Sequence, residues 1–319
     1  MIPSKLQIAK ELINISTDEE FDRMANEVLT FQRNSIPVLK DYWSLIKDKY
    51  PPIPIELFKS YRICSDKNNQ IAFKSSGTTS SQRSTHYIAD LDLYKTLSQF
   101  HFEEHFGQVE NQAIIALLPS YLDNGDSSLV FMVNHFIVES IEPSSAFVKQ
   151  EECAALIKNL QENKTPSVLF GVSFALLDLA DEISLDFPEL TIIETGGMKG
   201  KRKEMTRSEL HSRLQLSFPK SRIESEYGMT ELLSQAYTED GKWFQPPNWM
   251  RISVTDVSDP FKSLSIGSRG LLAITDLANI YSCSFIQTRD VGVLNEFGFF
   301  TVEGRLDNSD IRGCNLLHP

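Results

Sequence analysis

"SVLFGVSFALLDLADEISLDFPELTIIETGG", residues 167–197, contains a β-rich run, a helical pattern and a second β-rich run in direct succession. We predict strands at SVLF (167–170) and TIIET (191–195), with a helix at FALLDLADEI (174–183) between them. Short apolar runs rich in β-branched residues that alternate with helices are typical of βαβ units with parallel strands. This stretch therefore predicts an α/β fold class.

The same alternation continues on both sides of this stretch. We predict further strands at IAF (71–73), AIIALLP (113–119) and RIESEY (222–227), and helices at ADLDLYKTLSQFHFEEHF (89–106), SSLVFMVNHFIVES (127–140) and KEMTRSELHSRLQLSF (203–218). Later runs at 249–257, 270–277, 283–294 and 298–307 are extended and separated by Gly, Pro, Asn and Asp, which favours an antiparallel subdomain. Ligands of parallel sheets bind beyond the carboxyl ends of the strands.

These patterns divide the chain into four predicted parts. Residues 1–60 form an N-terminal helical region, 61–235 an α/β core, 236–306 a β-rich subdomain, and 307–319 a hinge and a short tail. The α/β core is expected to be layered, with helices on both faces of a parallel-rich sheet.

Composition excludes several classes of function. The 319 residues include 43 acidic and 31 basic ones, so the net charge of −12 argues against a nucleic-acid partner. The four cysteines show no C-x-x-C spacing and the N-terminus has no apolar signal core, which predicts a cytoplasmic protein. No apolar run approaches the roughly 20 residues of a spanning helix, so we expect no integral membrane segment.

A hydroxyl-rich loop, FKSSGTTSSQRSTHYI (73–88), follows one predicted strand. It contains Ser75, Ser76, Gly77, Thr78 and Thr79. A solvated turn is one interpretation, because these residue types favour turns. The other is an anion cradle, in which backbone N–H groups and hydroxyls converge on phosphate oxygens.

Three later segments offer groups for a nucleotide. After the strand at 191–195, Gly196 and Gly197 permit close approach of a flat ligand, and SEYGMTELLSQ (225–235) contains Tyr227, Gly228, Thr230 and Glu231. Tyr227 can present an aromatic face, Thr230 a hydroxyl for phosphate, and Glu231 an oxygen for Mg²⁺. Asp290 can accept from a ribose diol, and Arg305 is a charged fork for phosphate or ribose. Taken singly, a capped helix start and a β-hairpin explain these segments equally well.

Three other patterns are weaker. HFEEH (101–105) fits a zinc-peptidase spacing, but no third ligand is clear. Ser173 lies in a loosened nucleophile elbow, for which only His211 and the penultimate His318 are available downstream. TGGMKGKRK (195–203) does not have the spacing of a Walker loop.

Taken in order, the segments resemble the adenylate-forming superfamily of acyl-CoA synthetases, phenylacetate-CoA ligases, luciferase-like ligases and peptide-synthetase adenylation domains. The family's phosphate loop is similar to residues 75–79, its adenine segment to 196–197, its aromatic-Gly-x-Thr-Glu motif to 227–231, its ribose aspartate to Asp290, and its Gly-Arg-x-Asp hinge to 304–307. FKSSGTT, LLPSYLDNGDSSLVFM, ETGGMKGKR and DIRGCNLL look most like acyl-protein synthetases, the fatty-acid protein ligases of luminescence fatty-acid reductases.

The resemblance implies an ATP- and Mg²⁺-dependent ligase that activates a carboxylic acid, with a fatty acid favoured, as an acyl-adenylate. Its implied roles place the outgoing phosphates at Ser75, Ser76, Thr78 and Thr79, Mg²⁺ at Glu231, the α-phosphate at Thr230, adenine at Gly196, Gly197 and Tyr227, and ribose at Asp290 and Arg305. The acyl group would pass to a protein or thiol acceptor.

The implied acceptor is a cysteine near the C-terminus, and Cys314 matches it. Arg312 beside it would lower the pKa of the thiol, although an ordinary tail residue is the alternative. A separate acyl-accepting protein or a reductase is a further implied partner. Leu129, Phe131, Met132, Phe170 and Phe174 can line an acyl pocket or simply pack in the core.

Two departures keep alternatives open. Ser80, Ser81, Gln82 and Arg83 stand where the family has Gly and a Pro-Lys pair, so Arg83 can replace a lysine or have no such role. The chain stops at Pro319, so the C-terminal lid domain of about 100 residues, which carries the adenylation lysine, is expected to be absent. An acyl-CoA ligase for aryl or fatty acids, and a catalytically incomplete acyl- or nucleotide-binding subunit that needs a partner, remain the alternatives.

Overall fold

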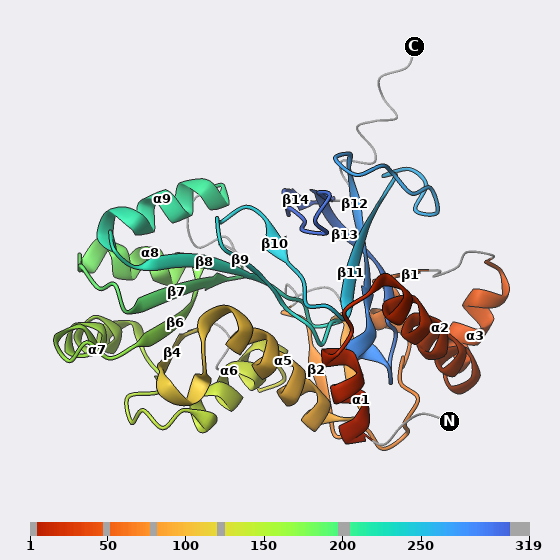
Figure 1. Ribbon diagram of the computed structural model, residues 1–319, viewed down its shortest axis with the longest axis horizontal. Coiled ribbons are helices and arrows are strands. Elements are labelled where there is room, and N and C mark those ends of the chain that lie inside the picture. The colour runs from red at the N-terminus through yellow and green to blue at the C-terminus, as the bar shows by residue number, and fades with distance from the viewer. Residues whose placement is uncertain (1–4, 47–51, 77–81, 120–124, 197–204, 307–319) are drawn as a thin grey trace, which may run out of the picture.

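The predicted α/β fold is confirmed by a computed structural model, which describes residues 5–46, 52–76, 82–119, 125–196 and 205–306 (Figure 1). Its largest sheet has seven strands in the order β10-β9-β8-β7-β6-β4-β5. Figure 1 shows this sheet between α9 above and α5 below, so helices cover both faces. The molecule is layered as the alternating pattern predicts.

The middle of the large sheet is parallel and buried. Its strands are β4 (Ala113–Leu117), β5 (Ala146–Phe147), β6 (Ser167–Val172), β7 (Leu190–Thr195) and β8 (Arg222–Tyr227), with β9 (Ala236–Thr238) and β10 (Phe244–Gln245) added antiparallel at one edge. Every residue of β4 and β6 is buried, as expected for strands covered on both faces.

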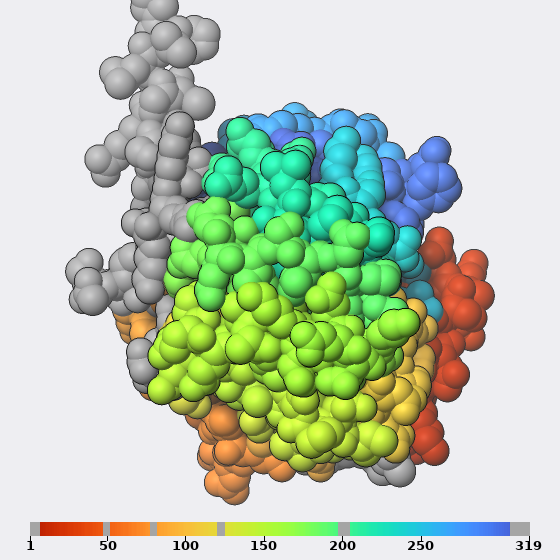
Figure 2. Space-filling model, turned by 90° about the vertical axis from the view of Figure 1, so that its left-hand side faces the viewer, coloured from red at the N-terminus to blue at the C-terminus, as the bar shows by residue number. Residues whose placement is uncertain are grey.

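The helices of the α/β core connect strands that follow one another along the chain. They are α5 (Leu91–Phe106), α6 (Ser128–Glu139), α7 (Gln150–Glu162), α8 (Ser173–Glu182) and α9 (Arg207–Ser217), with a 3₁₀ turn, η1, at Val109–Asn111. Helix α9 begins at Arg207 because Thr206 and Glu209 form a capping box. Helix α7 lies in a segment where the sequence analysis predicted no element. Figure 2 looks onto the end of the molecule formed by α7, α8 and α9.

The second sheet lies toward the C-terminal half. Its strands are β1 (Ile53–Pro54), β13 (Phe285–Val293), β12 (Arg269–Asp276), β11 (Met250–Thr255) and β14 (Gly304–Arg305), the last paired with β13. The expected extended run at 298–307 is a strand only at Gly304–Arg305, while Phe300 forms single bridges to Phe244 and Leu294. The predicted boundary at 235/236 falls between β8 and β9, which pair in the large sheet.

The N-terminal region is mostly helical. It contains α1 (Lys5–Ile13), α2 (Asp18–Ser35), α3 (Pro37–Ser44) and α4 (Leu57–Ser60), and is followed by the hairpin β2 (Ile71–Lys74) and β3 (Thr85–Ile88). Thr17 and Glu20 form a capping box at the start of α2. Within the described ranges, no helix combines the length and apolar character that crossing a membrane requires.

Buried Gln32 ties α2 to the 3₁₀ turn η2 (Leu277–Asn279) and its neighbours. Its Nε2 donates to Asn279 O at 3.0 Å, Ile280 O at 3.1 Å and Ser284 Oγ at 3.1 Å, and its Oε1 accepts from Ser284 N at 3.3 Å. A buried amide with this many partners fixes the helix against the second sheet.

Replacing Gln32 tests this connection. We expect Gln32→Leu to lower the free energy of unfolding by about 1–3 kcal/mol, because it leaves buried carbonyl groups without a donor. Urea unfolding followed by circular dichroism measures the change. Exposed Gln7→Leu is the control and is expected to stay within about 0.5 kcal/mol of wild type. Equal stabilities of the two variants would contradict the assigned role.

Candidate active site

An open cavity of about 720 Å³ lies where β7, β8 and β2 end. Of the residues predicted to bind a nucleotide, the cavity is lined by Ser75, Ser76, Gly196, Gly228, Thr230, Glu231 and Arg305; of those predicted for an acyl pocket, Leu129 and Met132 line it, and Phe131, Phe170 and Phe174 do not. Tyr227 and Asp290 are bonded to each other beside it. Gly77, Thr78, Thr79, Gly197 and Cys314 lie outside the described residues. The cavity thus collects groups that are up to 230 positions apart in the chain, at the carboxyl ends of the parallel strands.

The start of the hydroxyl-rich loop is held by two residues near its end, Arg83 and Ser84. Ser75 N donates to Ser84 O at 3.1 Å, and Ser84 N donates to Ser75 Oγ at 3.0 Å. Arg83 donates from Nε to Ser75 O and from a terminal nitrogen to Lys74 O at 3.2 Å. Arg83 therefore holds the loop's entry in place, and the Ser75 hydroxyl, which accepts one bond, still has a proton to donate outward.

The carboxylate of Asp126 pairs with two cationic side chains, Arg83 and Lys74, at the start of the loop. Its carboxylate lies 3.0 Å from Arg83 and 3.3 Å from Lys74, and its backbone O accepts from Lys74 N at 2.8 Å. Burial raises the pKa of Asp126, but hydrogen bonds from Arg83 and Lys74 outweigh it, so the net pKa is lowered. The carboxylate stays ionised and orients both side chains at the cavity rim.

The segment after β8 is anchored by a buried carboxylate, Asp276. Its Oδ2 accepts from Leu233 N at 3.1 Å and Ser234 N at 3.0 Å, and its Oδ1 accepts from Ser234 Oγ at 2.7 Å and Ala278 N at 3.0 Å. Asp276 ends β12 in the second sheet, whereas Leu233 and Ser234 follow β8 in the first. One side chain thus joins the two sheets beneath the cavity.

Two further residues fix Thr230 and Glu231. Asn279 Nδ2 donates to Glu231 O at 2.8 Å, and His86 Nδ1 lies 2.9 Å from Thr230 O. Burial lowers the pKa of His86 to about 4, so its ring is neutral and Nδ1 carries the proton that Thr230 O accepts. The backbone of this segment is therefore held from two sides while the Thr230 and Glu231 side chains face the cavity.

Glu231 offers one carboxylate to a metal. Its side chain is 6% exposed; burial raises its pKa, and a hydrogen bond from Ser84 lowers it. Across the described segments, no group of three His, Cys, Asp or Glu side chains could hold a metal ion. Such a site does not suit zinc, but it fits Mg²⁺, which is commonly bound by one or two carboxylates together with substrate phosphates.

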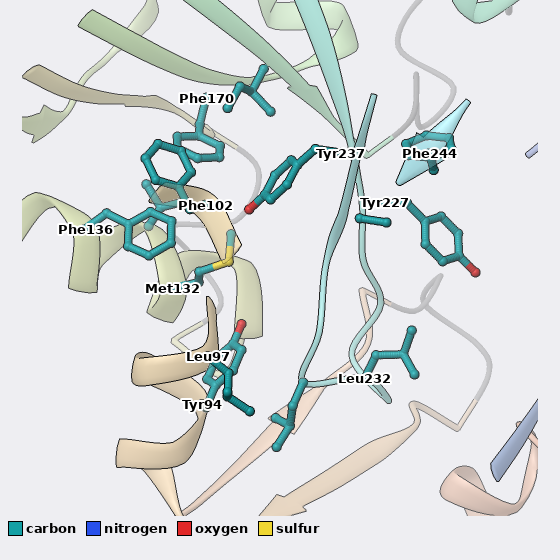
Figure 3. Close-up of a cluster of buried hydrophobic side chains, with 14 of the residues drawn as sticks. Tyr94, Leu97, Phe102, Met132, Phe136, Phe170, Tyr227, Leu232, Tyr237 and Phe244 are labelled. Atoms are coloured by element: carbon teal, nitrogen blue, oxygen red, sulfur yellow. The ribbon is translucent and has the colours of Figure 1, made fainter. Parts of the chain in front are cut away.

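Tyr227, Asp290 and Arg305 form a chain beside the cavity. The Tyr227 hydroxyl donates to Asp290 Oδ2 at 2.8 Å, and Arg305 Nε lies 3.7 Å from Asp290 Oδ1. Pairing of β13 with β14 sets Asp290 directly opposite Arg305. The Tyr227 ring packs edge-on against Phe300. It also lies near the ring of Phe244 (Figure 3).

Sequence reasoning did not identify Glu226, which lines the cavity one position before Tyr227. Its Oε2 accepts a short hydrogen bond from Thr195 Oγ1. Burial raises the pKa of Glu226 from 4.5 to about 7; the Thr195 bond lowers it and the charge of Glu194 raises it. The sequence did contain a signal for Glu226, because Glu224 and Glu226 are two carboxylates in one mostly buried strand, and carboxylates are rare in such strands.

Ser173 has a structural partner. Its hydroxyl donates to Glu194 Oε1 at 2.7 Å, whereas His211 lies 2.9 Å from the hydroxyl of Ser225. Ser173 is 3% exposed, and the Ser225 hydroxyl also donates to Glu194, at 2.9 Å. The serine and histidine of the hydrolase hypothesis are therefore not bonded to each other.

The HFEEH histidines belong to the core. The ring of His101 lies 4.6 Å from that of His105 and 5.4 Å from that of Tyr237. Burial lowers the pKa of His101 to about 4. With no three-residue metal group over the described part of the chain, these rings act as aromatic packing.

Comparison with known proteins finds the fold in solved structures. No protein-family model matches the chain, and no curated protein matches its sequence. An open form of 2-hydroxyisobutyryl-CoA ligase, in complex with 2-HIB-AMP and CoA, matches with a TM-score of 0.63 and 11% identity over 91% of this chain and 70% of its own.

Two further structures match over a shorter part. A long-chain-fatty-acid-CoA ligase from Archaeoglobus fulgidus matches with a TM-score of 0.53 and 16% identity over 79% of this chain and 54% of its own. ATP-bound MatB from Rhodopseudomonas palustris matches with a TM-score of 0.52 and 14% identity over 73% and 47%. The chain thus has the layered fold predicted for the N-terminal domain of adenylate-forming enzymes, and spans about half the length of these two.

Gly228 provides a steric test of the cavity wall. A Cβ at this position would collide with Glu226 Oε1 and lie 3.7 Å from Gln235 Cγ. We expect Gly228→Ala to displace the Glu226 carboxylate and to lower the affinity for ATP about tenfold or more. We also expect it to lower the free energy of unfolding by about 1–3 kcal/mol. Gly125→Ala is the matched control, because a Cβ there meets nothing within 4 Å. Equal affinities of the two variants for ATP, measured by calorimetry, would count against this geometry.

The raised pKa of Glu226 predicts a pH-dependent stability. Between its ordinary pKa of 4.5 and its folded pKa of about 7, the native state holds a proton that the unfolded chain has released. Its contribution to stability is therefore complete below pH 4.5 and is lost as pH rises through 7. We expect Glu226→Gln to gain about 1–3 kcal/mol relative to wild type between pH 5 and pH 8. Urea unfolding measures this, and exposed Glu110→Gln should show no such trend.

Proposed function

We propose that this chain binds ATP in the cavity and activates a carboxylic acid as an acyl-adenylate. The observation that carries the proposal is the meeting of Ser75, Thr230, Glu231 and Arg305 around one cavity, in the arrangement that the family resemblance implies. The fold shared with acyl-CoA ligases, among them the ATP-bound MatB, supports it. We place the protein among acid-thiol or acid-protein ligases.

In the proposed reaction a carboxylate oxygen of the acid attacks the α-phosphorus of ATP. The new bond joins the acyl oxygen to phosphorus, the bridging bond to the β-phosphate breaks, and pyrophosphate leaves with the electron pair. Negative charge shifts onto the pyrophosphate, so fixed donors at that point stabilise the transition state. When bound at Glu231, Mg²⁺ would supply further charge neutralisation.

The residues then have distinct roles. Ser75 and Ser76, together with the predicted Gly77, Thr78 and Thr79, would hold the outgoing phosphates, and Thr230 the α-phosphate. Asp290 and Arg305 would hold the ribose, with Tyr227, Gly196 and the predicted Gly197 around adenine. Arg83 does not take the place of a phosphate-binding lysine in this proposal, because its guanidinium is already bonded to backbone oxygens and to Asp126.

The acyl acceptor is a thiol in this proposal. Burial raises the pKa of Cys153 and of Cys283 to about 12 and also raises the pKa of the half-buried Cys64, so none of these thiols ionises readily. The predicted Cys314, a partner protein or coenzyme A remain as acceptors, and the likeness to 2-hydroxyisobutyryl-CoA ligase favours coenzyme A as the alternative to a protein. The resemblance to acyl-protein synthetases favours a fatty acyl group and a protein acceptor.

Pyrophosphate exchange tests the proposal. We expect the purified chain with Mg²⁺ to exchange labelled pyrophosphate into ATP when the correct acid is present, and Glu231→Gln to slow exchange about 100-fold. Arg305→Ala should weaken ATP binding about tenfold. Arg269→Ala is its control, since Arg269 pairs with Glu303 away from the cavity. Failure to bind ATP would overturn the proposal, whereas binding without exchange for any acid would favour the partner-dependent binding subunit.

A further inference from the structure

The inner part of the cavity is polar where a plain hydrocarbon chain would need apolar walls. Tyr94, Glu226 and Gln235 line it together with Leu129 and Met132. Tyr94 and Met132 are 1% exposed and Gln235 is 5% exposed, Leu129 and Glu226 are half-buried, and Ser76 at the hydroxyl-rich loop is exposed. In the proposed reaction the phosphate-binding residues take ATP, which leaves this part of the cavity for the acid.

The arrangement of β8 and β9 places these polar groups on one face. Glu226 is the register partner of Tyr237, so their side chains are neighbours on the same side of the sheet. Gln235 is two positions before Tyr237 and lines the same cavity as Glu226. Figure 3 shows the Tyr237 hydroxyl directed toward Met132 and the Tyr94 hydroxyl, away from Tyr227.

Gln235 has a free acceptor atom. The Tyr94 hydroxyl donates its proton to Ser128 O at 3.1 Å, so its oxygen accepts the hydrogen bond that it shares with Gln235. That bond uses the amide nitrogen of Gln235, and Oε1 is left without a partner in the described part of the chain. The Tyr237 hydroxyl, which is fully buried, also has no partner there.

Glu226 adds a second acceptor beside Gln235. Its Oε2 is bonded to Thr195, while its Oε1 lies against the Cα of Gly228, close to the Gln235 side chain. Burial of the unpaired Gln235 Oε1 against the methylene groups of a ligand costs about 1–3 kcal/mol. A ligand that donates a hydrogen bond would remove this cost, whereas a plain alkyl chain would leave it in full.

We propose that the acid bound here carries a hydroxyl or amino group, which donates hydrogen bonds to Gln235 Oε1 and Glu226 in the inner part of the cavity. This inference rests on the proposed function, and it narrows the substrate class from fatty acids in general to acids with a distal donor. Because burial holds the pKa of Glu226 near 7, the carboxyl can accept from an ammonium group as an anion or exchange hydrogen bonds with a hydroxyl.

Binding of matched acids to the full chain tests the inference. Hexanoate is compared with 6-hydroxyhexanoate and 6-aminohexanoate, and benzoate with 4-hydroxybenzoate and 4-aminobenzoate, by calorimetry and by pyrophosphate exchange with ATP and Mg²⁺. In at least one series we expect the donor-bearing acid to bind about 10- to 100-fold more tightly than its plain partner, because the site's acceptors stay unpaired with the plain acid.

Variants assign the preference to particular atoms. Gln235→Met and Glu226→Gln are expected to reduce the ratio of affinities about tenfold, with Gln235→Met improving binding of the plain acid. Gln108→Met and Glu110→Gln, which are exposed and outside the cavity, should keep the wild-type ratio. A ratio that falls equally in these controls would overturn the assignment.

The outcomes separate this inference from the proposed function. Exchange with plain acids that equals or exceeds exchange with their donor-bearing partners would overturn the inference and leave the ligase activity intact. Tighter binding of donor-bearing acids without exchange would support the inference about the pocket and count against autonomous activation. Absence of binding by both members of every pair would overturn the inference.

Discussion

The buried carboxylate of Asp276 is the constraint on which the site depends. It ends a strand of one sheet and accepts three hydrogen bonds from Leu233 and Ser234, which follow a strand of the other. Burial raises its pKa to about 6, while its hydrogen bonds, mostly from backbone N–H groups, lower it, so it remains an acceptor at neutral pH. This bridge, together with the hydrogen bonds from Asn279 and His86, holds the segment with Thr230 and Glu231 beside the sheet that carries Asp290 and Arg305.

The cavity combines two environments. At its rim, Asp126 neutralises Arg83 and Lys74 and keeps the entry of the hydroxyl-rich loop rigid. In its inner part, Glu226 is hydrogen-bonded to Thr195 and Gln235 to Tyr94. The charged groups of the rim are partly exposed, whereas Gln235 in the inner part is buried with an unpaired acceptor, which would penalise a ligand that cannot donate to it.

Most of the fold was predictable because long segments with a clear hydrophobic period are compatible with only one type of secondary structure. The strands at 167–172 and 190–195 and the helix between them are close to the predicted ranges. Helix α7 was missed although Cys153, Ala154, Ile157 and Leu160 recur at helical spacing and are buried. The expected strand at 298–307 is mostly irregular, since Phe300 forms single bridges to Phe244 and Leu294 instead of a continuous ladder. Local patterns do not reveal which of several extended runs will find a partner strand.

The sequence by itself determined the α/β class, because this depends on local order along the chain, and it supplied the residues that we propose bind a nucleotide. Tertiary structure alone decided that Glu226 lines the cavity, that Arg83 donates to the backbone oxygen of Ser75, and that Ser173 donates a hydrogen bond to Glu194. These outcomes depend on contacts between residues far apart in the chain and on which side of a strand or turn each side chain lies. Burial then sets the protonation of each group, and burial exists only once the sheets have packed together.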